Sequence, residues 1–545
     1  MFSISAQAEL VFKNDFETIS QADAVRFLTQ TSFGATQHDV DTVILLSYKG
    51  WIDEQMALDF DNHKIEQAVF NYNPDNYGLN AAWWDNAITG NNQLRNRVAY
   101  ALSQILVVSA EGYELSNRSI EVASYYDLLR RHAFGNYRDL LIEVSRHPAM
   151  GRYLSSKYNS KAIGNIRPDE NYARELLQLF TLGTHLLNPD GTVVLDAQDN
   201  PVKVYQQDQI KTFARVFTGW SLPGARYWLD NNPIHPSPVQ LMFDFDSSVL
   251  SNGVDTYHDS DAKTLFTGDV LAANQSATED LADAIDAVFA HQNIAPFISE
   301  QLIQRLVTSN PSRFYVSRIA QVFEDDGTGT KGNLSAVIKA ILTDNEALFG
   351  GEYNDNFGKY KEPTLMQSQL MRLFHGIEVT SGIYSGHYDH GFLIKDARAF
   401  SQSPLRAPSV FNFYRPDHYA SVALRDLGIR APELQIYSED VIAKILQSLE
   451  DNIQRFNTFT VDQLPWITAY PLFDFYPELE RLNTEGVDAL VDYLDLLLTA
   501  NHLPPAVKQN MREKLGMAFT DETKKQAIRN VIKIAVFHPS FWIQY

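Results

Sequence analysis

Four polar side chains stand close together in an otherwise apolar segment, which reads Glu170-Asn171-Tyr172-Ala173-Arg174-Glu175-Leu176-Leu177. On a helix, Glu170 lies one turn from Arg174. Asn171 likewise lies one turn from Glu175, which brings the two carboxylates about a turn apart. Such a pair is able to share a proton, an ion or an arginine, and it suits general acid and base catalysis. The segment is therefore the first candidate for a catalytic site.

The same residues also have a purely structural interpretation. Asp169 is able to cap the helix, and Glu170 favours the positive end of the helix dipole. Glu175 would then pair with Arg95 or Arg97 of a neighbouring helix and only fix the packing. The two interpretations make different demands, because a catalytic pair must line a wetted cavity and a packing network must be buried and paired.

Two further segments offer binding groups. In the polar loop 155–161, backbone donors and Lys161 are suited to hold an anion, although a solvated loop has the same composition. The segment 257–261 offers an imidazole and carboxylates, so His258 is predicted to complete the catalytic pocket and Asp259 to bind there. Solvated or capping histidines are the alternative.

No motif defines a metal site, a cofactor or a reaction. The histidines of segments 257–261 and 386–391 lack a ligand spacing such as H-E-x-x-H, so no metal is predicted. Segment 325–332 has neither the alternating carboxylates of an EF-hand nor the GK[ST] of a P-loop, and it is interpreted as a turn between helices. The absence of G-x-S-x-G argues against a common α/β serine hydrolase.

The elements that must position these residues are mostly helices. Apolar residues recur at helical spacing in segments 94–106, 281–289, 334–342, 441–449 and 487–497. The second segment follows a Thr278-Glu279 start, Asn333 is the predicted cap of the third, and the fourth follows Ser438. These patterns predict a mainly all-α fold, a bundle-like array of many helices.

Strand signals are few. The runs 192–195 and 202–205 flank Asp199-Asn200 and predict a small β-hairpin inserted between helices, and long loops complete the fold. The chain is expected to divide into an N-terminal extension and three helical regions, with the boundaries 1–20, 21–205, 206–350 and 351–545.

Composition and charge argue against several classes of binding partner. The 545-residue chain has 67 acidic and 45 basic residues and a net charge of −22, which argues against nucleic acid or an anionic membrane surface as a partner. No apolar run approaches the roughly 18 residues of a membrane span. With no cysteine, the chain has no disulfide, thiolate zinc site or cysteine nucleophile.

The first residues predict export to the periplasm or the extracellular space. Ala6 and Ala8 match the A-x-A pattern at the end of a secretory signal, so residues 1–20 are interpreted as an extension with a signal-peptide remnant. The lack of cysteine is compatible with oxidising surroundings.

From about Ala22 to Trp542 the chain resembles the bacterial domain-of-unknown-function family numbered 1800. The pieces that carry the resemblance are Arg26 to Gly34, Leu94 to Gln104, Glu170 to Gly183, Phe217 to Trp220, His258-Asp259 with Lys263-Thr264, and Pro408 to Phe413. The resemblance implies an exported helical protein, often encoded beside a sulfatase-like or alkaline-phosphatase-like exported protein, and it implies no established activity. It draws attention to the polar residues inside these pieces, namely Arg95, Arg97, Glu170, Asn171, Arg174, Glu175, His258 and Asp259.

Two hypotheses about function follow. In the first, the protein is a binding or assembly partner of another exported protein. In the second, it is a hydrolase or another enzyme that acts on an extracellular carbohydrate or modified polymer. The catalytic residues would then be Glu170, Glu175, Arg174 and His258, and the binding residues Arg95, Arg97, Asn171, Lys161 and Asp259. The cofactor is unknown at this level.

Overall fold

The computed structural model describes residues 19–60, 76–225, 228, 240–245, 257–354, 356–374, 401–454 and 475–545. The predicted signal-peptide remnant and the histidines at 387 and 390 lie outside these residues.

Helices dominate the fold, as the apolar periodicity predicts. In the first part of the chain they are α2 (Gln21–Thr31), α3 (Gln37–Ala57), α5 (Asn76–Thr89), α6 (Gln93–Ser103), α7 (Ser119–Arg131), α8 (Tyr137–Arg146), α9 (Pro148–Tyr153), α10 (Asn171–Glu175), the π-helix η3 (Leu176–Thr181) and α11 (Gln207–Val216). The middle part contains α13 (Ala277–Ala290), α14 (Ile294–Leu306), α15 (Arg313–Glu324), α16 (Leu334–Thr343), α17 (Asn345–Tyr353) and α18 (Pro363–Leu373). The last part contains α20 (Val422–Asp426), the 3₁₀ helix η4 (Pro432–Gln435), α21 (Glu439–Gln454), α22 (Tyr476–Thr484), α23 (Val487–Thr499), α24 (Pro505–Gly516), α25 (Asp521–Phe537) and α26 (Pro539–Trp542).

Local capping explains where several of these helices begin. Asn333 accepts a hydrogen bond from the Ser335 amide and caps α16, as predicted. Helix α13 starts earlier than the sequence indicates, because Ser276 and Glu279 form a capping box and make Ala277 the first helical residue. The segment between α15 and α16 is a turn, in agreement with the interpretation of residues 325–332.

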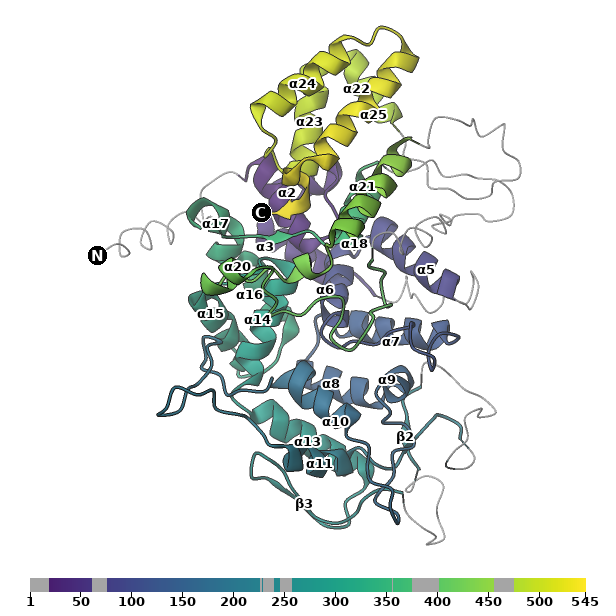
Figure 1. Cartoon of the computed structure of the whole chain (residues 1–545), viewed down its shortest axis with the longest axis vertical. Helices are drawn as coiled ribbons and strands as arrows, with labels where there is room; N and C mark the ends of the chain where they lie inside the picture. The colour runs from purple at the N-terminus through teal and green to yellow at the C-terminus, as the bar shows by residue number, and fades with distance from the viewer. Residues whose placement is uncertain are drawn as a thin grey trace.

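The helices form an elongated stack (Figure 1). Helices α22 to α25 occupy one end, α14 to α18 lie in the middle, and α8, α10, α11 and α13 lie toward the other end. The buried apolar side chains form a cluster that runs from Ala24 to Phe541 in the sequence. The end of the chain returns to the middle of the stack, where Lys359–Tyr360 (β5) pairs antiparallel with Ile543–Gln544 (β6).

The remaining strands are short. Trp220–Ser221 (β1) pairs with Phe243–Asp244 (β2), and Lys263–Thr264 (β3) pairs with Val270–Leu271 (β4), both antiparallel. The predicted hairpin is present as isolated antiparallel bridges, of which Leu195 with Pro201 closes the turn around Asp199. The domain boundaries at residues 20, 205 and 350 stay a prediction.

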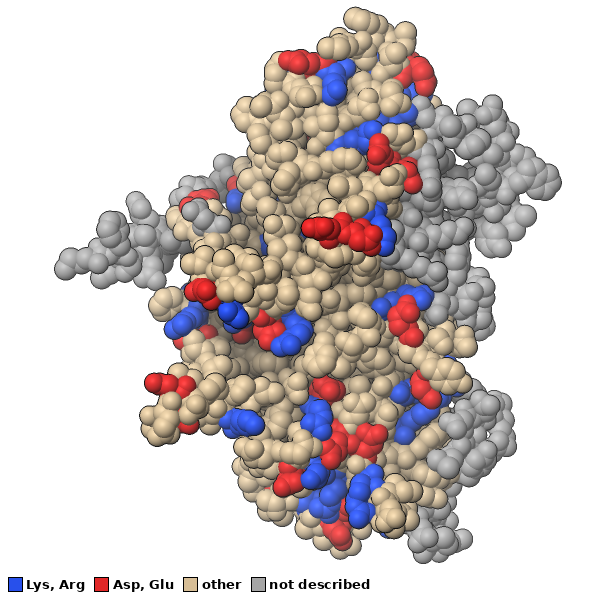
Figure 2. All heavy atoms as spheres, in the orientation of Figure 1, with Lys and Arg blue, Asp and Glu red and all other residues tan. Residues whose placement is uncertain are grey.

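Surface charge is mixed on the face that Figure 2 shows, where acidic and basic side chains lie beside one another. None of the helices in the described ranges combines the length and the apolar composition needed to cross a bilayer.

Candidate functional site

The predicted catalytic segment begins as an α-helix and changes its hydrogen bonding halfway. Asp169 accepts a hydrogen bond from the Asn171 amide at 2.8 Å, which starts α10 as the sequence suggested. After Glu175 the chain continues as the π-helix η3, in which the Leu182 amide reaches back to the Leu177 carbonyl at 2.9 Å. Single-turn π segments inside helices are frequent at functional sites, so the surroundings of this one matter.

Glu170 lies at the surface in an ion pair. Its carboxylate accepts from Arg174 Nη2 at 2.9 Å and from Gln207 Nε2 of α11 at 2.6 Å. About a third of each side chain of the ion pair is exposed, and Asn171 beside them is exposed as well. Such a pair contributes little to stability. Both bonds go to the same oxygen of Glu170, Oε2.

Glu175 is buried, and its Oε2 atom has no hydrogen-bond partner among the described residues. Burial raises the pKa of this carboxyl, and Arg174 only partly offsets the effect. The charge of Glu175 also contributes to raising the pKa of Tyr153 and Tyr205, after burial as the main cause. Glu175 is thus a buried acid near two phenols and does not share the surface ion pair of Glu170.

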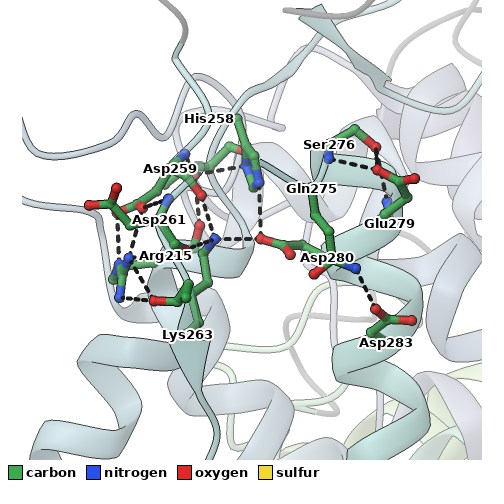
Figure 3. A network of polar contacts seen from close by, with 12 residues as sticks. Arg215, His258, Asp259, Asp261, Lys263, Gln275, Ser276, Glu279, Asp280 and Asp283 are labelled. Atoms are coloured by element: carbon green, nitrogen blue, oxygen red, sulfur yellow. Dashed lines mark hydrogen bonds and ion pairs between the residues drawn. The ribbon is translucent and has the colours of Figure 1, made fainter. Parts of the chain in front are cut away.

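His258 and Asp259 belong to a separate polar network (Figure 3). His258 Nε2 lies 3.0 Å from Asp280 of α13, and Nδ1 lies 2.9 Å from the Thr218 carbonyl. Lys263 Nζ pairs with the same Asp280 carboxylate at 2.6 Å. His258, Lys263 and Asp280 are nearly inaccessible to solvent, so this part of the network fixes the loop against α13.

Arg215 of α11 closes the other side of this network. Its guanidinium binds the Asp259 carboxylate through two parallel bonds of 2.7 and 2.8 Å. The side-chain hydrogen bond and the charge of Arg215 outweigh burial and lower the pKa of Asp259. Gly219 makes the close approach possible, because a Cβ atom there would lie 2.8 Å from His258 Cβ.

The remaining predicted binding residues lie elsewhere. Arg95 is buried over the Phe134 ring and donates to the Arg130 carbonyl at 3.1 Å. Arg97 is fully buried and donates to the Arg305 carbonyl at 2.8 Å. Lys161 is half-buried and its amide donates to the Tyr257 carbonyl at 2.7 Å. Thus Glu170 and Arg174 lie together, and His258 and Asp259 lie together in another place. The structural interpretation expected Arg95 or Arg97 to pair with Glu175, but both arginines donate to backbone carbonyls instead.

A cleft of about 310 Å³ lies next to these segments and was not predicted. Its polar wall includes Gln104, Gln178, Gln301, Gln304 and Arg305, and its apolar wall includes Leu179, Leu182, Phe297, Val410 and Phe411. The lining includes parts of three pieces that carry the family resemblance, at Gln104, at 178–183 and at 410–411. The catalytic segment therefore contributes to the cleft with its C-terminal end and not with its carboxylates.

Several buried polar atoms of the cleft wall are unpaired among the described residues. They are Gln104 Oε1, Gln301 Nε2, Gln304 Oε1 and Arg305 Nε, on side chains that are at most 7% exposed. A buried donor or acceptor without a partner costs about 1–3 kcal/mol. Four such atoms therefore lie on side chains that line one cleft.

Behind this wall lies a buried network of charges centred on Glu362, the residue before α18. Four side chains donate to its carboxylate, Tyr100 at 2.8 Å, Gln104 at 2.5 Å, Gln402 at 2.6 Å and Tyr414 at 2.8 Å. Burial alone would raise the pKa of Glu362, but the charges of Lys359, Arg97 and Arg305 hold that pKa below its usual range. Gln104 and Arg305 connect this network to the cleft.

Sequence reasoning missed the Glu362 network and the glutamines of the cleft. A weak signal was present in α14, where Gln301, Gln304 and Arg305 interrupt an apolar helix. Residues 359–362, with two lysines and a glutamate before a proline, gave a second signal. Both patterns are also typical of a solvated helix face or loop, so only their burial identifies them.

No group of three or more His, Asp or Glu side chains in the described segments is arranged to hold a metal ion. The comparison with curated proteins and the comparison with solved structures gave no match. A family model matches residues 26–543, nearly the whole chain, and its description is a protein of unknown function, DUF1800. The chain belongs to this family.

Proposed function

We propose that the protein is an exported binding or assembly partner of another exported protein, and that the cleft takes a segment of that partner. The observation that carries the proposal is the set of buried, unpaired amide and guanidinium atoms in the cleft wall. Amide side chains offer both donors and acceptors, which suits the backbone of an extended peptide. The apolar wall with Phe297 and Phe411 would cover the side chains of the same segment.

The acidic residues of the cleft favour binding over acid and base catalysis. Glu300 pairs with Arg430 at 2.6 Å, and Asp417 pairs with Arg415 at 2.7 Å. Both carboxylates are therefore already bound to an arginine in the cleft wall. The partner that the family resemblance implies is a sulfatase-like exported protein.

The alternative is an enzyme that acts on an extracellular carbohydrate or modified polymer, and one observation favours it. Glu175 has a raised pKa, is buried and adjoins a π-helical turn, which are properties of a general acid. This alternative predicts that Glu175→Gln abolishes turnover of such a polymer while the thermal unfolding temperature stays at or above that of the wild type.

The binding proposal is tested with the purified protein and a sulfatase-like exported protein, the class of partner that the family resemblance implies. Biolayer interferometry is expected to detect a complex with the wild type. Val410→Trp fills the cleft and should weaken the complex about tenfold or more. Val422→Trp is the matched control, since Val422 is exposed on α20 and is not part of the cleft. Binding unaffected by Val410→Trp would exclude the cleft as the interface, and no binding by the wild type would exclude this partner.

A further inference from the structure

The buried charges behind the cleft do not balance. Arg97, Arg305 and Lys359 are three cations, and the carboxylates that act on them are Glu362 and Glu433. Lys359 Nζ faces acceptors only, namely Glu433 at 3.0 Å and the carbonyls of Gln304 and Arg305 at 3.0 and 3.2 Å. All three ammonium donors are therefore used. Burial lowers the pKa of Lys359, and the charges of Glu433 and Glu362 oppose this effect. The basic residues outnumber the carboxylates by one.

Of these three basic residues, Arg305 is the one that lines the cleft. It is 2% exposed, and its guanidinium carbon lies 4.4 Å from the centre of the Tyr414 ring. The other arginines of the cleft wall, Arg415 and Arg430, are already paired with Asp417 and Glu300. Burial disfavours its charge, but Tyr414, Glu362 and Glu433 outweigh burial and raise the pKa of Arg305. Arg305 is therefore a charged group of the cleft wall, and an anion that enters the cleft would be attracted to it.

We infer that the occupant of the cleft is a peptide segment that presents a carboxylate to Arg305, with its neighbouring peptide amide bonded to the cleft glutamines. This inference rests on the proposed function and names the chemistry of the partner's segment. The unpaired Gln301 Nε2 is able to donate to the C=O of a peptide unit, and either Gln104 Oε1 or Gln304 Oε1 is able to accept from its N–H. Arginine recognises carboxylates through charge-assisted hydrogen bonds. A volume of about 310 Å³ limits the occupant to a short stretch of chain.

Three capped dipeptides test the inference by saturation-transfer NMR titration at constant ionic strength. N-acetyl-glycyl-leucine has a terminal carboxylate, N-acetyl-glutamyl-leucinamide has only a side-chain carboxylate, and N-acetyl-glycyl-leucinamide has none. We expect one of the two acidic peptides to bind at least about tenfold more tightly than the neutral peptide, because a charge-assisted bond to a buried cation is lost in the latter. Which acidic peptide binds tells whether the partner offers a chain end or an acidic side chain.

Arg305→Met is expected to reduce binding of the acidic peptide to the level of the neutral one. Arg529→Met is the matched control, because Arg529 is also buried with an unpaired Nε but lies on α25 and outside the cleft wall. If Arg305→Met does not fold, the affinities of the three peptides for the wild type still test the carboxylate inference. Equal affinity for all three peptides, or no binding of any, overturns the carboxylate inference. The proposed function fails separately, when the intact partner does not bind the wild type.

Discussion

The two charged networks of this protein differ in how their basic residues are paired and in their access to a cavity. In the network of Figure 3, Arg215 and Lys263 each have a carboxylate of their own, Asp259 and Asp280. In the Glu362 network, Arg97, Arg305 and Lys359 share the carboxylates of Glu362 and Glu433, and Arg305 lines a cleft. The difference teaches that ions paired one to one fix the packing, whereas shared carboxylates beside a cleft leave a basic residue to which an anion can bind.

The largest effect is expected for Glu362→Gln. This change leaves Arg97, Arg305 and Lys359 buried with a single carboxylate, and breaking a buried pair costs about 3–5 kcal/mol. Urea unfolding measures the loss of stability, and Glu513→Gln on the exposed face of α24 is the control. A loss no larger than that of the control would break the comparison, because the cations would then not depend on Glu362.

Asp280→Asn probes the network of Figure 3. It should lower the free energy of unfolding by about 2–4 kcal/mol, since Lys263 loses its carboxylate while keeping carbonyl acceptors. The comparison predicts that peptide binding in the cleft does not change. Urea unfolding and the NMR titration on the same variant check both statements. Weaker peptide binding in Asp280→Asn would show that the two networks are coupled.

Lys361→Met tests the burial of a lysine next to Glu362. Burial lowers the pKa of Lys361 to about 7, although Gln369 accepts from its Nζ at 2.9 Å. The folded protein therefore favours the neutral lysine. Protonation of Lys361 lowers the free energy of unfolding progressively as the pH falls from the unfolded-state pKa of about 10.4 to the folded-state pKa, and the loss is constant below that value. Lys361→Met should raise the free energy of unfolding by about 1–3 kcal/mol at pH 7, after the cost of an unpaired Gln369 oxygen.

Thermal unfolding of Lys361→Met at pH 6 and pH 9.5 checks the sign. The gain in unfolding temperature over the wild type should be larger at pH 6. An equal gain in unfolding temperature at pH 6 and pH 9.5 would mean that Lys361 does not titrate between these two pH values.

The smallest effect is expected for Glu175→Gln. The raised pKa of Glu175 means that its charged form is penalised in the folded protein, and the penalty is absent well below pH 4.5 and fully present above the folded-state pKa. Glu175→Gln should therefore stabilise the protein by about 1 kcal/mol at pH 8 and by less at pH 4.5. Destabilisation at pH 8 would instead place Glu175 in a paired network, like Asp280.

Most of the fold was predictable, and the reason is periodicity. Segments 94–106, 334–342 and 487–497 carry apolar stripes, and the structure has α6, α16 and α23 there. Helix starts were less predictable, because two residues near the start of α13 were able to cap it and only Ser276 does. The change from α10 to η3 left no signal in the pattern, since a π turn shifts hydrogen bonds without changing residue types.

The candidate site was predictable only in pieces. Glu170 and Glu175 were expected to lie about a turn apart, yet one is at the surface and the other is buried. The reason is that residues five positions apart point about 140° away from each other around a helix axis. Their catalytic roles, and those of Arg174 and His258, stay a prediction.

By itself the sequence determined the helical class, the family and the polar residues that have chemistry to offer. Each of these follows from residue types at short spacing, which local physics connects to structure. Only the tertiary structure decided which polar residues share a site. Gln104, Gln301 and Phe411 come from segments far apart in the chain, and packing of whole helices brings them to one cleft. Burial matters as well, because an arginine on a solvated face interacts weakly with its neighbours, whereas a buried arginine depends strongly on the charges around it.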